Sequence, residues 1–368
     1  MMSKNVVEPL GIALIFTTAT IGNRRRESDL RYEKLLQPES SRPDERTPLL
    51  QPPHSLPPQP KSHSLQHWLP YPDTRQFHNN IPSRILRKFP FLLEIWYWAL
   101  TYWPYQLARA RTAVWINSDP DRKAAIFAQA ERNAIRVLRI EEWLSINIEH
   151  GLQHFILTRC RYWVMTVLCD VYLSHIAVGV AFLGYAYTCF PREQYQRVRR
   201  SIFLNNILAF LIMSLYRCTP PRLMPSSHHF VDVLHPNPSN PGATPPSDWA
   251  NNRFQLTIAA MPSLHFGTAL LIGLSVARWG THLWFSVLGY LYPVLMFVVV
   301  ISTANHWVLD CVAGLCVVGL GWGLNWVVLL LVPVEQWCLW VLRVEKPGEV
   351  MRISGEDVQE GNEVVVVS

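Results

Sequence analysis

The sequence predicts an all-α integral membrane protein whose core is a six-helix transmembrane bundle. Of its 368 residues, 49% are hydrophobic and only 16% are charged. A soluble domain usually carries about 25% charged residues. The shortage of charge comes from long uncharged blocks rather than from even dilution, and this distribution is typical of a multi-span membrane protein.

The chain divides into four parts by composition. Residues 1–22 hold an apolar run, 9–22, that is shorter than the ~20 residues a transmembrane helix needs. We interpret it as a marginal first span or an interfacial segment. Residues 23–88 are polar and rich in proline, which predicts a disordered segment because few apolar side chains are present to offset the entropy of ordering. Residues 89–333 form the predicted transmembrane core, and 334–368 form a tail.

The core contains a series of apolar runs that we interpret as spans. Glu94 lies inside the first run, where a carboxylate faces either a polar cavity or the membrane interface. The last run carries Gly314, Gly319, Gly321 and Gly323, which predict a small-residue face for close helix packing. The predicted spans are 89–107, 162–190, 201–216, 262–277, 283–303 and 308–332.

Between the first two spans the sequence predicts helices beside the membrane. Asp119 followed by Pro120 is a helix start, with a capping side chain and a proline at the first helical position. Residues 121–139 alternate apolar and charged residues at helical spacing, which predicts an amphipathic helix. We expect a further helix over 141–157.

The distribution of basic residues predicts the orientation. The short loop 191–200 is dense in arginine, and the positive-inside rule places it in the cytosol. The segment 23–88 falls on the same side. The loop 217–260 then lies on the opposite face, which we expect to be the lumenal face of an endomembrane, Golgi or endoplasmic reticulum. The arginine-rich segment 109–161 is an exception, since it would lie on the outer side.

Several kinds of site are not predicted. The formal net charge is +6, but the basic residues sit beside apolar runs, which indicates topology rather than nucleic-acid binding. The seven cysteines show no CxxC spacing, so neither a disulfide framework nor a zinc site is supported. We expect no cofactor and no metal. One metal site stays open, at His228, His229, Asp232 and His235, as an alternative to a solvated loop or to a loop at the rim of the substrate site.

Two histidines are predicted to meet at one membrane face. His265 begins the fourth span and His306 follows the fifth. Two spans joined by a short turn cross the bilayer out and back, so their far ends return to the same face. Arg217 and Arg222 follow the end of the third span on that face. The sequence therefore brings two imidazoles and two cations to one surface.

These residue types suit phosphoryl transfer on a lipid. His306 and Asp310 are four apart, so on a helix they would share a face. A carboxylate bonded to one ring nitrogen fixes the tautomer and leaves the other nitrogen free to attack, which predicts a phosphohistidine. His265, at a helix start that favours anions, would protonate the leaving oxygen. Arg222 and Arg217 would supply positive charge for the phosphoryl oxygens.

Two polar residues interrupt the second span. Tyr172 and His175 are three apart, so they would share a helical face. Polar side chains in a span usually face the bundle interior and are often functional.

The candidate residues fall in three motifs that follow one another along the chain. The first, within 216–225, is Pro220-Pro221-Arg222, and the second, within 261–265, is Pro262-Ser263-Leu264-His265. The third, within 303–310, is His306 with Asp310.

This arrangement resembles the three-part signature of the type 2 phosphatidic acid phosphatase superfamily. It is most similar to the subgroup that includes the fungal inositol phosphorylceramide synthases, over roughly residues 120–333. The resemblance implies a six-helix membrane core. It also implies His306 as nucleophile, Asp310 as its orienting carboxylate, His265 as general acid, Arg222 and Ser263 in the phosphate pocket, and Tyr172, His175 and Asn305 near the substrate.

The chain departs from the superfamily pattern at its phosphate cations. The superfamily has lysine where this chain has Leu215, and Ser-Arg where it has Val299 and Val300. Leu264 also replaces a glycine of the second motif. Two expected cations are therefore missing, and Arg217 or Arg253 would have to substitute.

The resemblance implies a lipid phosphotransferase or phosphatase, with phospholipid and a lipid acceptor as its partners. Transfer of phosphoinositol to a sphingolipid is one reaction of this class. Hydrolysis of a lipid phosphate is the alternative within the class. A degenerate relative that binds phospholipid without turnover is the alternative outside it. The missing cations favour this alternative, whereas the intact set of His265, His306 and Asp310 argues against it.

Overall fold

The computed structural model describes residues 4–25, 71–234 and 257–347. Within these ranges the regular structure is helical, and the single β feature is one isolated parallel bridge between Cys218 and Ala259. The all-α prediction is confirmed. The chain forms two compact units: one comprises 1–19 with 94–328, and the other 20–93 with 329–368.

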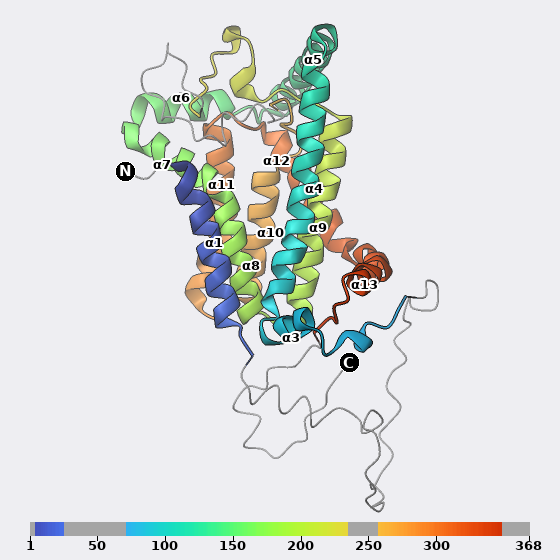
Figure 1. Ribbon diagram of the computed structural model, residues 1–368. Coiled ribbons are helices and arrows are strands. Elements are labelled where there is room, and N and C mark those ends of the chain that lie inside the picture. Colours follow the sequence, from blue (N-terminus) through green and yellow to red (C-terminus); the bar gives the residue numbers. More distant parts are fainter. Residues whose placement is uncertain (1–3, 26–70, 235–256, 348–368) are drawn as a thin grey trace, which may run out of the picture. The chain divides into compact units, whose positions relative to one another are not determined.

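The first unit is a helical bundle (Figure 1). Helix α10 packs against α8, α9, α11 and α12, so it is the common neighbour of the helices that carry the candidate site. Two short 3-10 helices, η4 (Pro221–Leu223) and η5 (Ser226–His228), follow α9. The helices are α1 (Lys4–Gly22), α4 (Phe91–Asn117), α5 (Pro120–Leu144), α6 (Glu149–Arg159), α7 (Tyr162–Leu173), α8 (His175–Cys189), α9 (Arg192–Leu215), α10 (Leu264–Trp279), α11 (Leu283–Ser302) and α12 (Val308–Gly323).

The second unit contains η3 (Arg75–Phe77), α3 (Ile81–Lys88) and α13 (Val332–Val341). The division between the units falls within η6 (Asn325–Leu331), near the end of α1 and near the start of α4. His78 Nδ1 lies 2.8 Å from Glu345 Oε2, which ties its two chain segments together. The predicted disorder over 23–88 is wrong for the end of that segment, because α3 forms there with a proline in its first turn. The rest of the prediction, 26–70, lies outside the described residues, as does most of the tail.

Fewer described helices meet the length and composition of a membrane span than the six that the sequence pattern predicts. Two described helices, α9 and α11, are long and apolar enough to cross a membrane. Two bent pairs also qualify if each is one span, namely α7 with α8 and α12 with the helices after it. The count is therefore two to four among the described residues. The apolar helices 9–22 and α10 are shorter, and the six-span bundle stays a prediction.

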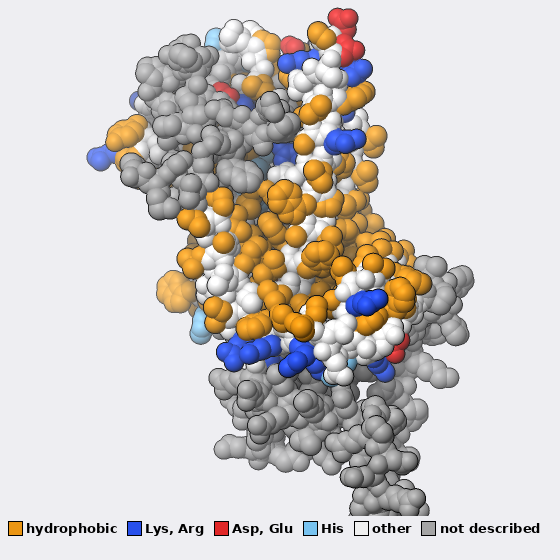
Figure 2. Space-filling model, in the orientation of Figure 1, with side chains coloured by type: hydrophobic (Ala, Val, Ile, Leu, Met, Phe, Trp, Pro, Cys, Tyr) orange, Lys and Arg blue, Asp and Glu red, His pale blue; other side chains and the backbone are white. Residues whose placement is uncertain are grey.

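Apolar side chains are exposed along these helices. Figure 2 shows hydrophobic side chains covering much of the face that α4 presents. Leu107 on α4 and Leu211 on α9 are at least half exposed, as is Val294 on α11. In water such a surface would be costly, whereas in lipid it needs no compensation. The helices of this unit therefore have the exterior of a membrane protein.

Two predicted helices are broken where the site lies. The predicted helix 141–157 is wrong as one element: α5 ends at Leu144, Ser145 takes a left-handed φ of 58°, and α6 begins at Glu149. The predicted span 162–190 bends by 52° between α7 and α8. By contrast, the arginines of 191–200 do not form a loop, because α9 is continuous from Arg192.

Glu94 is paired inside the bundle. Its two carboxylate oxygens lie 2.8 and 2.9 Å from Nη1 of Arg199 on α9, and Glu94 is 2% exposed. The Arg199 guanidinium also lies over the Tyr97 ring, 4.5 Å from its centroid. Of the two positions expected for Glu94, the structure shows the one inside the bundle against a polar partner. The ion pair joins α4 to α9.

Glycines allow α10 and α12 to approach closely. A Cβ on Gly314 would lie 2.7 Å from the Ser263 carbonyl oxygen, and one on Gly267 would lie 3.3 Å from the Gly314 carbonyl oxygen. Gly319 and Gly323 have nothing within 4 Å of a built Cβ. The predicted small-residue face is thus half correct, because only part of the glycine series meets another helix.

Candidate active site

The turn between α11 and α12 carries His306. The backbone N–H groups of Asn305 and His306 donate to the Val300 carbonyl oxygen at 3.1 and 3.3 Å. Trp307 follows as the N-cap of α12, is fully buried, and donates its indole N–H to the Thr219 carbonyl oxygen at 2.9 Å. His306 is therefore fixed on a turn that is anchored on both sides.

The His306 ring is oriented by two acceptors. Its Nδ1 lies 2.7 Å from the carbonyl oxygen of Ala260 and 3.5 Å from Oδ2 of Asp310. A carbonyl oxygen can only accept, so Nδ1 carries the proton and Nε2 keeps its lone pair. The orienting carbonyl of Ala260 had no signal in the sequence, because any residue type supplies one.

Asp310 reaches His306 by a different route from the one predicted. His306 precedes α12, so the two residues do not share a helical face, and that premise is wrong. Asp310 is the third residue of the helix, and its Oδ2 accepts the Trp307 N–H at 2.8 Å. This capping bond turns the carboxylate back toward the residue before the cap.

The second motif places His265 at the start of α10. Ser263 is the N-cap, and its hydroxyl oxygen accepts the Phe266 N–H at 3.3 Å. The Ser263 N–H donates to the Asp310 carbonyl oxygen at 2.9 Å, which joins the second motif to the third. As a result, the His265 and His306 ring centroids lie 6.0 Å apart.

His265 also lies against the break between α7 and α8. The Tyr172 ring stacks on it with a centroid distance of 4.1 Å, and the His175 ring lies 4.7 Å away. The Nδ1 of His175 is buried without a hydrogen-bond partner among the described residues. The predicted pocket residues Tyr172 and His175 are therefore brought to His265, although the bend, not one helical face, brings them.

The first motif places Arg222 beside the His306 turn. Its backbone N–H donates to the Ala304 carbonyl oxygen at 2.9 Å, and its Nε donates to Asn305 Oδ1 at 2.9 Å. Its Nη1 donates to Asp232 Oδ2 at 3.0 Å, and the side chain is 6% exposed. Sequence reasoning considered Asp232 only as a metal ligand and missed this role.

Of the two other predicted cations, Arg217 and Arg253, the structure describes only Arg217. No described contact joins the Arg217 side chain to either histidine or to Arg222, and its buried Nε has no hydrogen-bond partner in this part of the chain. Arg253 lies outside the described residues.

Three buried carboxylates meet the first N–H groups of α12. Besides Asp310, Glu149 Oε1 accepts the Val308 N–H at 2.8 Å, and Glu141 Oε1 accepts the Leu309 N–H at 2.7 Å. Burial and the neighbouring Glu149 carboxyl raise the pKa of Glu141 to about 9. Neither glutamate was predicted to belong to the site, because each lies far from His306 in the sequence.

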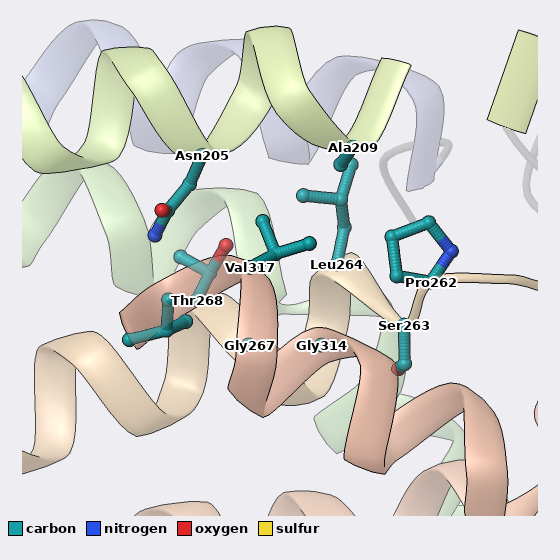
Figure 3. A pocket seen from close by; sticks show the side chains of 10 residues that line it. Asn205, Ala209, Pro262, Ser263, Leu264, Gly267, Thr268, Gly314 and Val317 are labelled. Atoms are coloured by element: carbon teal, nitrogen blue, oxygen red, sulfur yellow. The ribbon is translucent and has the colours of Figure 1, made fainter. Parts of the chain in front are cut away.

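A small pocket lies beside the second motif, and neither histidine lines it. Figure 3 shows it where α9, α10 and α12 meet, with Asn205, Leu264, Thr268 and Val317 pointing into it. Pro262 and Ser263 belong to its lining, but His265 and His306 do not. Its apolar walls make it a packing gap between helices rather than a phosphate pocket.

Comparison with known proteins identifies a family. A family model described as the PAP2 superfamily matches residues 135–324, a little more than half of the chain. The matched region contains Arg222, His265, His306 and Asp310. Searches of curated proteins and of solved structures found no significant match.

Proposed function

The chain belongs to the PAP2 superfamily, and from that premise we propose that it is a membrane lipid phosphotransferase or phosphatase that works through a phosphohistidine at His306. The observation that carries the proposal is the pairing of the two histidines. The ring of His306 is held with Nε2 unprotonated, and the ring of His265 lies 6.0 Å away, close enough for one phosphoryl group to sit between them.

In the first step, His306 Nε2 attacks the phosphorus of a phospholipid. The N–P bond forms as the P–O bond to the leaving lipid breaks, and the leaving oxygen takes a proton from the His265 imidazolium. The positive charge that develops on the His306 ring is stabilised through Nδ1 by the Ala260 carbonyl and the Asp310 carboxylate. The step therefore needs His265 protonated and His306 neutral.

In the second step, an acceptor hydroxyl attacks the phosphohistidine. His265, now neutral, takes the hydroxyl proton, the new P–O bond forms, and the N–P bond breaks, which returns both histidines to their starting states. Water as acceptor gives hydrolysis, and a lipid hydroxyl gives transfer. The reaction class thus depends on which hydroxyl reaches His265.

Arg222 supplies the fixed charge for the phosphoryl oxygens. Asn305 and Asp232 hold its guanidinium beside the His306 turn, so little reorganisation is needed when phosphate binds. The first N–H groups of α10, after the Ser263 cap, add further donors. We assign the phosphate contacts to these groups, and the described contacts give Arg217 no part in them.

A transferase is the candidate we favour within the class. Tyr172 and His175 pack against His265 and give it an aromatic and polar wall, at which an acceptor hydroxyl can be bound and bulk water excluded. Phosphoinositol transfer to a sphingolipid, at the lumenal face of an endomembrane, is the specific reaction that the motif resemblance suggests.

The test uses the purified full chain with labelled phospholipids, offering ceramide, diacylglycerol or water as acceptor. We expect turnover of at least one donor, and loss of that turnover in His306→Ala. His150→Ala is a matched control, because this histidine is exposed on α6 and outside the proposed chemistry. Turnover that survives His306→Ala would exclude the mechanism. Phospholipid binding without any turnover would favour the non-catalytic alternative.

A further inference from the structure

The start of α12 is held in an unusual way. Trp307, Val308 and Leu309 follow His306 directly, and their three N–H groups go to carboxylates from three different elements. A helix start is ordinarily capped by one side chain and by water. Here Glu141 comes from α5 and Glu149 from α6, in addition to Asp310 of α12 itself.

The three carboxyl groups at the start of α12 are all buried. Glu141 and Asp310 are fully buried and Glu149 is 1% exposed. No cation makes an ion pair with either glutamate in the described part of the chain. Three buried negative charges around one helix start would repel one another more than the helix dipole, about half a unit charge, can offset. One of the three carboxyl groups must therefore keep a proton.

The geometry points to the two glutamates as the place of that proton. Glu141 and Glu149 accept the N–H groups of two successive residues, Leu309 and Val308, so their carboxyl groups lie close together at the helix start. Two neighbouring carboxyl groups can hydrogen-bond to each other only if one of them is protonated. Glu141 Oε2 is buried and has no donor among the described residues, so a proton placed on it would be shared with Glu149.

We propose that Glu141 and Glu149 are positioning residues that share one proton and so hold the start of α12, and with it the His306 ring, in the geometry for attack. Neither glutamate touches the phosphoryl group. They act through the backbone of the residues that follow His306. This proposal rests on the proposed function for its activity readout only.

The pair also makes the site sensitive to alkaline pH. The groups that face Glu141 are Glu149 on α6, Asp310 and Cys311 on α12, and Cys218 beside η4, and Asp310 in turn faces His306. The folded pKa of Glu141, about 9, lies above its usual value of 4.5, so the protonated form is stabilised. That stability is present at low pH and is lost as pH rises through about 9, when a second charge enters the pair.

The experiment compares turnover between pH 7 and pH 10 for four variants. Glu141→Gln and Glu149→Gln each keep an oxygen for the helix N–H and an N–H for the other glutamate, so each imitates the protonated pair. We expect both to stay within about 3-fold of the parent at pH 7 and to lose the alkaline fall in kcat. Glu141→Ala should lose roughly 10-fold or more, because a small displacement of a nucleophile is costly. Glu142→Gln, at the exposed neighbouring position, should behave as the parent.

A readout independent of turnover separates this proposal from the proposed function. Diethyl pyrocarbonate modifies accessible neutral imidazoles, and peptide mass spectrometry gives the rate at His306. We expect a faster rate in Glu141→Ala than in the parent at pH 7, and an unchanged rate in Glu141→Gln. If no phospholipid turns over, the proposed function fails and this rate still decides the role of the pair. An unchanged rate in Glu141→Ala, or Gln variants with the parent's alkaline fall in kcat, would overturn the proposal.

Discussion

His306 Nδ1 lies 2.7 Å from the carbonyl oxygen of Ala260, nearer than the 3.5 Å that separates it from Asp310 Oδ2. The backbone, and not only a carboxylate, therefore fixes which nitrogen carries the proton. Ala260 directly precedes the second motif, which begins α10 and carries His265. The same segment of the chain therefore positions His265 and orients His306. The two histidines are coupled through this backbone segment.

The first prediction concerns Asp310. Because the Ala260 carbonyl keeps the His306 tautomer, Asp310→Asn should leave the ring correctly protonated and remove only the negative charge. We expect a loss of roughly 10- to 100-fold in kcat, because the positive charge that develops on the His306 ring loses a charged acceptor worth about 1.5–3 kcal/mol. His306→Ala should lose all measurable turnover. Equal losses in the two variants, measured at saturating phospholipid, would show that the carbonyl does not fix the tautomer.

The second prediction concerns the approach of α10 to α12. A methyl group on Gly314 would meet the Ser263 carbonyl oxygen at 2.7 Å, so Gly314→Ala must push the two helices apart. Overpacking of this kind costs about 1–3 kcal/mol, and here it also displaces His265 from His306. We expect lower turnover and a lower Tm. Gly319→Ala, on the same helix with nothing within 4 Å, is the control and should change neither.

The third prediction concerns the contribution of the Glu94–Arg199 pair to the stability of the fold. Glu94→Ala leaves Arg199 without its carboxylate partner in the bundle, and breaking a buried pair costs about 3 kcal/mol. We expect a clear drop in the Tm of the purified protein. The double variant Glu94→Leu with Arg199→Met should recover most of the loss, because no unpaired charge remains. A Glu94→Ala protein that melts like the parent would contradict the role given to this pair.

The fourth prediction concerns Arg222. Lysine keeps the charge but cannot reach Asn305 and Asp232 together, as the guanidinium does. Losing one hydrogen bond to a charged group removes about 1.5–3 kcal/mol, which is roughly 10- to 100-fold in kcat/KM. Arg222→Lys should show this loss in turnover assays. Arg139→Lys, at an exposed position on α5, should not, and an Arg222→Lys enzyme as active as the parent would remove Arg222 from the phosphate site.

Local rules made part of this structure predictable. The start of α5 is capped as expected, with the Asp119 side chain accepting two backbone N–H groups and a proline in the first turn. The three motifs could be identified because each combines a helix end with polar residues at short spacing. The roles of His265, His306 and Asp310 remain predictions, but the structure places the three side chains together.

What could not be predicted depends on distant segments meeting. Glu149 and Glu141 reach α12 across 159 and 168 positions of sequence, and nothing local to either glutamate indicates that partner. The ion pair between Asp232 and Arg222 could not be predicted either, because Asp232 lies in a loop without regular spacing to Arg222. Ala260 contributes through its carbonyl oxygen, which carries no sequence signal. The helix breaks at Ser145 and Ser174 were also missed, since neither residue is a strong helix breaker.

The most direct test of the central claim is to trap the covalent intermediate. The purified protein would be mixed with a phospholipid labelled in its phosphate, quenched in alkali, which preserves phosphohistidine, and digested for peptide mass spectrometry. The account predicts that the label is on the peptide containing His306, that it is absent in His306→Ala, and that an acceptor removes it. Turnover of the phospholipid with no label on His306, or with label on His265 instead, would contradict it.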